Sequence, residues 1–188
     1  IEDRLDWVRK GRVAAFAGKN GDQEVVGLAL EVARKTQKEF LPQQLFAALN
    51  EVVSQQYQQP ADIVLLLEPG ALPKTTSGKL QRSACKQGWM TSSLNTYAEF
   101  SGGRLIACRD ESLLQAANQP PITQSEQTLA ALWSELLKTP QDNIYAQDHF
   151  LSLGGNSIKA VQLQSRIRQE WHLNISLKDL FEHATLSR

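Results

Sequence analysis

The period of the hydrophobic pattern changes partway along this 188-residue chain, and the change limits the folds that it can adopt. Before about residue 90, short β-rich runs alternate with helical ones, whereas after Thr123 only the helical period remains. Side chains return to the same face every second residue in a strand and about every 3.6 residues in a helix. The sequence therefore predicts an α+β unit of short sheets with helices, followed by an all-α unit.

The α+β unit is expected over residues 1–88 and contains four recognisable patterns. Residues 11–18 and 24–33 predict a hairpin, and residues 41–57 predict an amphipathic helix. Residues 61–70 predict a short buried strand, and residues 79–88 predict a further short helix. The polar residues KNGD at 19–22 are typical of a hairpin turn. In the helix, Leu45, Leu49 and Val53 recur at helical spacing and form its buried side.

Residues 89–122 are expected to be a linker. Gly102-Gly103 and Pro120-Pro121 punctuate a polar stretch. Leu94, Tyr97 and Phe100 recur at a spacing of three, which predicts one short helix docked on the first unit. We therefore expect the units at 1–88 and 123–188 to move independently of each other.

The second unit, residues 123–188, has the pattern of a helical bundle. Thr123 and Glu126 have the spacing of a capping box before an amphipathic helix. A second helix is expected from Ser157, with a wide apolar side that includes Ile158 and Val161. A third is expected at 176–184. The pattern predicts a four-helix bundle.

Composition excludes several function classes. Twenty basic residues balance twenty acidic ones, which favours neither nucleic acid nor an anionic membrane as a partner. No apolar run is long enough to span a bilayer. Cys85 and Cys108 are isolated, which favours a reducing cytoplasm, and the three histidines lack metal-ligand spacing with them, so no metal site is expected. The chain begins at Ile1 and its one methionine is Met90, which predicts a piece of a longer protein.

The segment LPKTTSGKLQR, residues 72–82, has the residue types that contact phosphate. It is not a P-loop, because Thr75 stands where the second glycine belongs and Leu80 follows Lys79. A mobile lysine next to a glycine can stabilise developing negative charge in another domain's site. Composition alone favours a simpler alternative, a surface turn with solvated lysines.

The order of residues in this segment closely resembles the C-terminal lysine motif of the adenylate-forming enzymes, which include acyl-CoA synthetases and peptide-synthetase adenylation domains. The residues that match are Pro73, Lys74, Thr75, Ser77, Gly78, Lys79 and Arg82. With GRVAAFAG at 11–18, the segment looks most like the fatty acyl-AMP ligases. The resemblance covers residues 1–88 and implies that Lys79 is catalytic, between the carboxylate and the ATP α-phosphate. It also implies that Gly78 lets the loop pack closely, while Thr75 and Ser77 shape the loop.

The second motif, LGGNS, ends at Ser157. A hydrolase signature G-x-S-x-G fails here, because Lys159 takes the place of the last glycine. No histidine is convincingly placed as a base, although a distant one remains open from sequence. A simpler alternative is a glycine turn in which Asn156 or Ser157 caps the following helix.

The wider segment DHFLSLGGNSIKAVQLQSRI closely resembles the attachment segment of peptidyl carrier proteins. The residues that match the pattern are Asp148, Phe150, Leu153, Gly154, Gly155 and Ser157. The resemblance covers residues 123–188 and implies that the Ser157 hydroxyl receives 4′-phosphopantetheine. It also implies that Gly154 and Gly155 leave room for the modifying enzyme. Asn156 departs from the commoner Asp or His.

Together the two resemblances imply a loading fragment of a nonribosomal peptide synthetase or hybrid enzyme. A fatty acid would react with ATP and magnesium to form acyl-AMP, and the carrier thiol would then collect the acyl group. The implied partners are a large N-terminal adenylation subdomain, without which the fragment is inactive, a phosphopantetheinyl transferase, and a downstream condensation or ketosynthase domain. Two alternatives remain, namely amino-acid activation and a non-catalytic carrier module.

Overall fold

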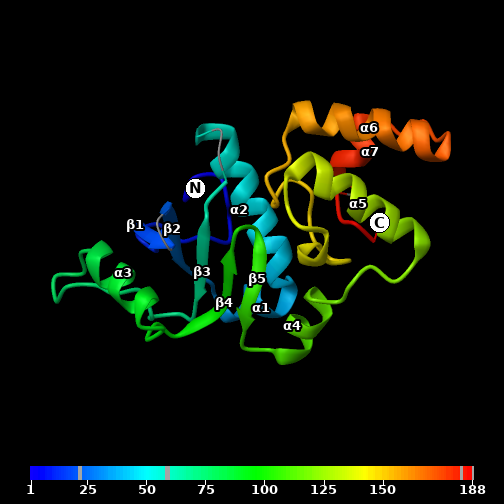
Figure 1. Cartoon of the computed structure of the whole chain (residues 1–188). Helices are drawn as coiled ribbons and strands as arrows, with labels where there is room; N and C mark the ends of the chain where they lie inside the picture. Colours follow the sequence, from blue (N-terminus) through cyan, green and yellow to red (C-terminus); the bar gives the residue numbers. More distant parts are fainter. Residues whose placement is uncertain (21–22, 58–59, 183, 188) are drawn as a thin grey trace. The chain divides into compact units, whose positions relative to one another are not determined.

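The computed structural model describes residues 1–188 except 21–22, 58–59, 183 and 188 (Figure 1). The chain divides into two compact units, Ile1–Glu111 and Ser112–Arg188. The first contains the sheet and the second is helical, which confirms the predicted fold class. The predicted turn residues 21 and 22 lie outside the described part of the chain.

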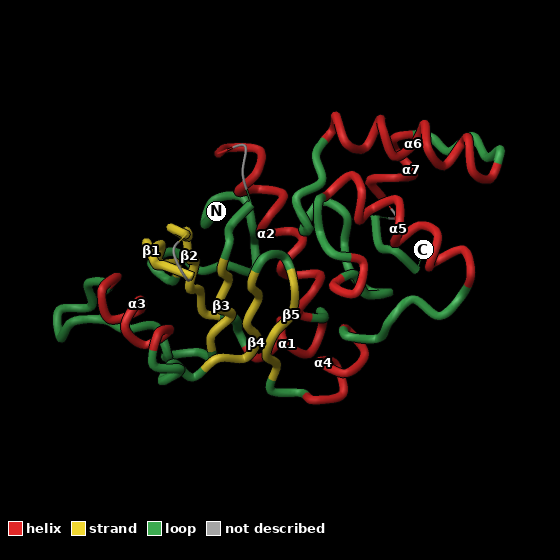
Figure 2. Tube along the Cα trace, viewed as in Figure 1, coloured by secondary structure: helices red, strands yellow, loops and turns green. Residues whose placement is uncertain are grey.

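A five-stranded mixed sheet forms the first unit (Figure 2). Its strands follow the chain order and are β1 Val13–Asn20, β2 Gln23–Glu31, β3 Ile63–Leu67, β4 Thr96–Ser101 and β5 Arg104–Cys108. β2 and β3 pair in parallel, and the other neighbours pair antiparallel. All five residues of β3 are buried, as is usual for a central strand covered on both faces.

Helices cover both faces of this sheet. α1 Arg34–Glu39 and α2 Pro42–Tyr57 follow β2, and α3 Arg82–Met90 follows the lysine segment. On one face, Phe46 of α2 stacks on Phe100 of β4, with ring centroids 4.2 Å apart. On the other, Cys85 of α3 joins a core cluster with Phe16 of β1. The alternation of side chains along each strand therefore fills two separate cores.

The predicted linker at 89–122 is wrong over its central part. β4 and β5 occupy residues 96–108 and pair with each other and with β3, so the first unit extends to residue 111 rather than 88. Tyr97 and Phe100 are buried, but on a strand rather than on the predicted helix. Gly102 and Gly103, both with positive φ, form the hairpin turn. A short helix, α4 Glu111–Ala117, follows the hairpin.

The second unit packs its helices around one apolar core. It contains α5 Gln124–Leu137, a 3-10 helix at Gln141–Asn143, α6 Ser157–Trp171 and α7 Leu177–Glu182, which follow α4. The predicted capping box is present, since Glu126 N–H donates to Thr123 Oγ1 and Thr123 N–H to Glu126 Oε2. The backbone N–H groups of Thr123 and Ile122, which both donate to Glu126 Oε2, lower the pKa of the Glu126 carboxyl.

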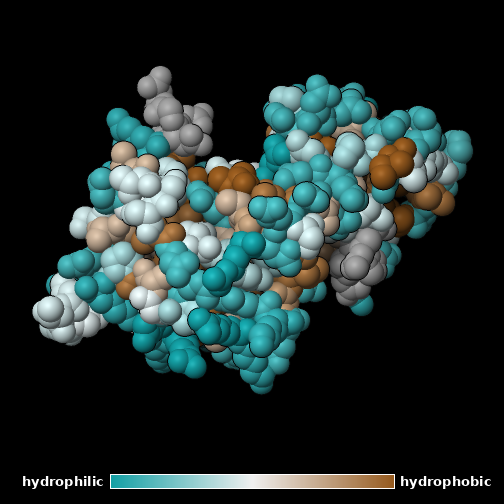
Figure 3. All heavy atoms as spheres, turned by 90° about the horizontal axis from the view of Figure 1, so that it is seen from below, coloured by the Kyte–Doolittle hydropathy of each residue, from teal (hydrophilic) through white to brown (hydrophobic). Residues whose placement is uncertain are grey.

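The predicted apolar side of α6 is narrower than expected. Ala160, Leu163 and Ile167 are buried in the core. Ile158 and Val161 are 72% and 49% exposed, so this part of the predicted apolar side is not buried. Polar residues cover most of the face seen in Figure 3, with apolar residues in small groups. No helix of the described residues is long and apolar enough to cross a membrane.

Candidate functional site

The lysine segment folds into a closed loop between β3 and α3. Lys74 and Leu80 form an antiparallel bridge at its base. Inside it, Thr75 N–H donates to Lys79 O at 2.8 Å, and Gly78 N–H donates to Thr75 O at 2.8 Å. Gln81 N–H donates to Pro73 O at 3.0 Å. The backbone therefore fixes the shape of the loop, and α3 begins only after it, at Arg82 rather than at the predicted residue 79.

The hydroxyl groups of this loop bond to the loop itself. Thr75 Oγ1 accepts a hydrogen bond from Lys79 N–H at 3.0 Å and lies 2.9 Å from Ser77 Oγ. Gly78 has φ +82°, and a Cβ added there would meet no atom within 4 Å. Glycine is therefore needed for the backbone conformation rather than for space.

The two lysines of the loop have different environments. Lys74 Nζ donates to Gly11 O at 2.9 Å and so ties the base of the loop to the turn before β1. Lys79 is exposed, next to the bridge that closes the loop, and no ion pair or side-chain hydrogen bond of Lys79 is found among the described residues. A free ammonium on a closed, well-shaped loop is available to a negatively charged group from outside the unit.

The second candidate site is the start of α6. Asn156 is its N-cap, and its side-chain Oδ1 accepts from Lys159 N–H at 2.9 Å. Ser157 is the first residue of the helix and is exposed. No hydrogen bond of the Ser157 hydroxyl occurs within the part of the chain that the structure describes. Asn156 therefore caps the helix, and the Ser157 hydroxyl remains available at the helix N-terminus.

The two glycines before Asn156 are required for different reasons. Gly154 has φ +92°, which side chains rarely tolerate. Gly155 packs against Phe150, and an added Cβ would lie 2.5 Å from its Cδ1 and 2.6 Å from its carbonyl oxygen. Lys159 Nζ donates to Gly154 O at 2.9 Å, a contact that the sequence motif did not indicate. The glycine pair thus shapes the turn that presents Ser157.

Substitution of Gly155 by alanine should destabilise the second unit. Because the added methyl group would meet both the ring and the backbone of Phe150, which is fully buried, we expect a loss of about 1–3 kcal/mol in the free energy of unfolding. Urea unfolding followed by circular dichroism measures the loss. Gly78→Ala is the matched control in the first unit, where strain but no clash is expected; a Gly155→Ala variant as stable as the wild type would contradict the argument.

Two other residues of the carrier-like motif, Asp148 and Phe150, support the turn before the serine. Phe150 packs edge-on against Trp133 of α5, with ring centroids 5.2 Å apart. Asp148 is buried, and its Oδ2 accepts from Tyr145 N–H at 2.8 Å. These contacts join the loop before α6 to the core, so the residues of the carrier-like motif help to hold Ser157 in place.

The histidines do not support the hydrolase alternative. Burial lowers the pKa of His149, and its backbone bridges to Thr185. No hydrogen bond joins His149 or His172 to Ser157 in the described structure, and His183 lies outside the described residues. No group of three or more His, Cys, Asp or Glu residues that could hold a metal ion occurs among the described residues.

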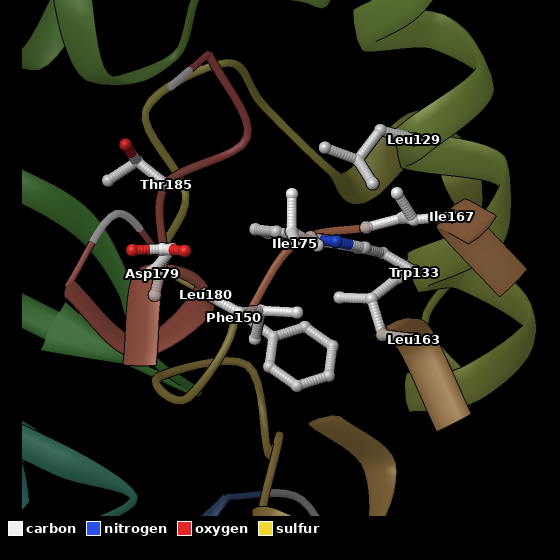
Figure 4. Close-up of a pocket in the computed structure, with 10 residues that line it drawn as sticks. Leu129, Trp133, Phe150, Leu163, Ile167, Ile175, Asp179, Leu180 and Thr185 are labelled. Atoms are coloured by element: carbon white, nitrogen blue, oxygen red, sulfur yellow. The ribbon is translucent and has the colours of Figure 1, made fainter. Parts of the chain in front are cut away.

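A cavity of about 320 Å³ lies inside the second unit (Figure 4). Its lining is mostly apolar, with Leu129 and Trp133 from α5 and Leu163 and Ile167 from α6 around it. Asp179 and Thr185 add polar groups at one side. Neither Ser157 nor the glycine pair lines it, so the cavity is separate from the candidate attachment site.

Comparison with known proteins finds one family model that matches the second site and relatives that match nearly all of the chain. Residues 127–188 match the family described as "Phosphopantetheine attachment site". Domains of this family carry 4′-phosphopantetheine, so the prediction of that cofactor is confirmed. The chain is 32% identical over 184 residues to the N-(5-amino-5-carboxypentanoyl)-L-cysteinyl-D-valine synthase of Amycolatopsis lactamdurans. It is 29% identical over 183 residues to surfactin synthase subunit 1 of Bacillus subtilis.

These matches include nearly all of the chain but little of each relative. They cover 95% and 96% of the chain and 4% of each synthase. A solved structure, the McyG A-PCP complexed with phenylalanyl-adenylate, is 22% identical, has a TM-score of 0.51, and matches 98% of this chain and 28% of that one. Residues 127–188 therefore match the phosphopantetheine attachment family, and nearly all of the chain is similar to short segments of peptide synthetases, with the fold of an adenylation–carrier segment.

Proposed function

We propose that the chain is the part of a loading module that completes acyl activation and then carries the acyl group. In the first reaction, a carboxylate attacks the α-phosphate of ATP and releases pyrophosphate, which leaves acyl-AMP. In the second, a thiol attacks the acyl carbon and releases AMP, which leaves a thioester. The observation that carries the proposal is the exposed Ser157 hydroxyl at the start of α6, presented by a glycine turn.

Ser157 is the proposed site of the 4′-phosphopantetheine arm. Backbone N–H groups in the first turn of a helix have no intrahelical partner, and the helix dipole is positive there. A phosphodiester on Ser157 is therefore well placed electrostatically. A phosphopantetheinyl transferase would supply the arm from coenzyme A, and Gly154 and Gly155 keep the approach free of side chains.

Lys79 is the proposed catalytic residue of the first reaction. Its ammonium would offset the negative charge that develops as the carboxylate attacks and pyrophosphate leaves. Its exposure supports this role, because the nucleotide, magnesium and acyl group would lie in a large N-terminal adenylation subdomain. Thr75, Ser77 and Gly78 would act only through the shape of the loop.

The proposed substrate is a fatty acid, because the lysine segment and residues 11–18 resemble the fatty acyl-AMP ligases. The acylated carrier would then deliver its thioester to a downstream synthetase domain, such as a condensation or ketosynthase domain. Amino-acid activation is the second candidate. It is favoured by the Amycolatopsis relative, whose name describes a product built from amino acids.

The test is acid-dependent exchange of pyrophosphate into ATP, in the enzyme that joins this chain to a large adenylation subdomain. We expect exchange with fatty acids and none with the proteinogenic amino acids. Exchange with an amino acid alone would replace the fatty acid by the second candidate. A lack of exchange with either class would leave the carrier function, which the modification of Ser157 tests separately.

A further inference from the structure

A buried carboxylate holds the base of the lysine loop, and the sequence motifs did not indicate it. Glu31, the last residue of β2, is 9% exposed. Its Oε1 accepts a hydrogen bond from Leu72 N–H at 3.0 Å, and its Oε2 accepts one from Arg12 Nη1 at 2.9 Å. Leu72 is buried and stands directly before Pro73, just ahead of the closed loop. One carboxylate thus joins the loop to the edge of two strands.

A second contact ties the loop to the same edge. Lys74 Nζ donates to Gly11 O, next to the arginine that pairs with Glu31. The N–H groups of Gly11 and Arg12 in turn donate to Glu2 Oε1 at 3.0 and 3.3 Å. The base of the loop is therefore fixed by hydrogen bonds, while residues 76–79, which include Lys79, are exposed.

The carboxylate at position 31 is costly to bury unless both of its oxygens are bonded. Bonds between an ionised carboxylate and N–H donors are short and strong, and they are directional. The alanine variant would leave the Leu72 N–H group buried without a partner. These contacts therefore fix the position at which the loop begins.

We propose that Glu31 is a positioning residue for Lys79, whose carboxylate fixes the base of the loop so that the lysine reaches the reacting groups in one geometry. The inference rests on the proposed role of Lys79 and adds a second residue to it. A misplacement of about 1 Å can lower a rate by about a hundredfold, so a modest loosening at the base is sufficient for a large effect.

The structural part is tested on this chain by amide hydrogen exchange. In Glu31→Ala, exchange at Leu72 and at the loop amides of Thr75, Gly78 and Lys79 should accelerate about tenfold or more. In Glu31→Gln it should change little, because the amide oxygen still accepts from Leu72 N–H. Glu68→Ala is the matched control. It removes another buried carboxylate, 4% exposed and paired with Arg109, that does not bond to the loop base.

The functional part is tested by pyrophosphate exchange in the enzyme that contains the large adenylation subdomain. We expect Glu31→Ala to lower kcat by about ten- to hundredfold with KM for ATP unchanged, and Glu31→Gln to retain most of the rate. In a Lys79→Ala background, Glu31→Ala should cause no further loss, because the residue acts through Lys79. Glu68→Ala should leave kcat close to the wild-type value.

Each remaining outcome has a separate meaning. An equal loss on Glu31→Ala with and without Lys79 would show a general structural role and overturn the inference. The inference is equally overturned if Glu31→Ala keeps full activity while Lys79→Ala does not. If Lys79→Ala itself keeps the wild-type rate, the proposed role of Lys79 fails, and the inference that depends on it fails with it.

Discussion

Ser157→Ala should abolish phosphopantetheinylation of the chain. With coenzyme A and a broad-specificity phosphopantetheinyl transferase, the wild type should gain about 340 Da, as a serine-linked arm requires, and the variant should gain nothing. The fold should survive, because Asn156 rather than Ser157 caps α6 and the Ser157 side chain is exposed. Intact-mass spectrometry measures the gain directly.

The control for this experiment lies on the same helix. Ser165 is also exposed on α6, but it lies in the third turn and not at the helix N-terminus. Ser165→Ala should therefore be modified as fully as the wild type. An arm that is still attached in Ser157→Ala would place the modification elsewhere and remove the basis of the proposed carrier function.

Lys79→Ala should cause the second large effect, in the enzyme that includes the large adenylation subdomain. Removing one preorganised electrostatic group lowers kcat by about 10²- to 10³-fold in comparable sites, and we expect a loss of that size in acyl-AMP formation. Transfer from preformed acyl-AMP to the thiol should suffer less, because pyrophosphate has already left. Pyrophosphate exchange and single-turnover thioester formation measure the two steps separately.

A matched lysine is available for comparison. Lys86 is exposed on α3, which follows the loop, so Lys86→Ala removes the same charge from the same unit without touching the loop. It should leave both steps unaffected. Equal losses of both steps in Lys79→Ala would indicate that Lys79 maintains structure and has no special part in the formation of the adenylate.

The sequence predicted the secondary structure well wherever one local rule was sufficient. The capping box at Thr123 and Glu126 is formed as expected, because both of its hydrogen bonds are local. The apolar residues of α2 recur at helical spacing, and Leu45 and Leu49 are buried as predicted. Lys79 is exposed on its loop, and Ser157 is the first residue of α6, where the sequence predicted a helix to begin.

The predictions failed where a local sequence pattern is compatible with two different structures. Tyr97 and Phe100 fit a helical spacing, yet they lie on β4 because pairing with β3 satisfies the backbone of both strands. Gly102-Gly103 is typical of a flexible linker, yet here it forms a two-residue hairpin turn. Glu31 could not be found from sequence at all, since its partners Leu72 and Arg12 are distant along the chain.

The hairpin of β4 and β5 has a practical consequence for exchanging domains between synthetases. A junction at residue 88 would remove both strands and expose the edge of β3, whose sequence IVLLL is apolar throughout. An unpaired apolar edge is a template for aggregation. A junction after Arg109 keeps the hairpin and the bond from Arg109 to Glu68. Of two recombined proteins with the same carrier, the one joined after Arg109 should therefore be more soluble than the one joined at residue 88.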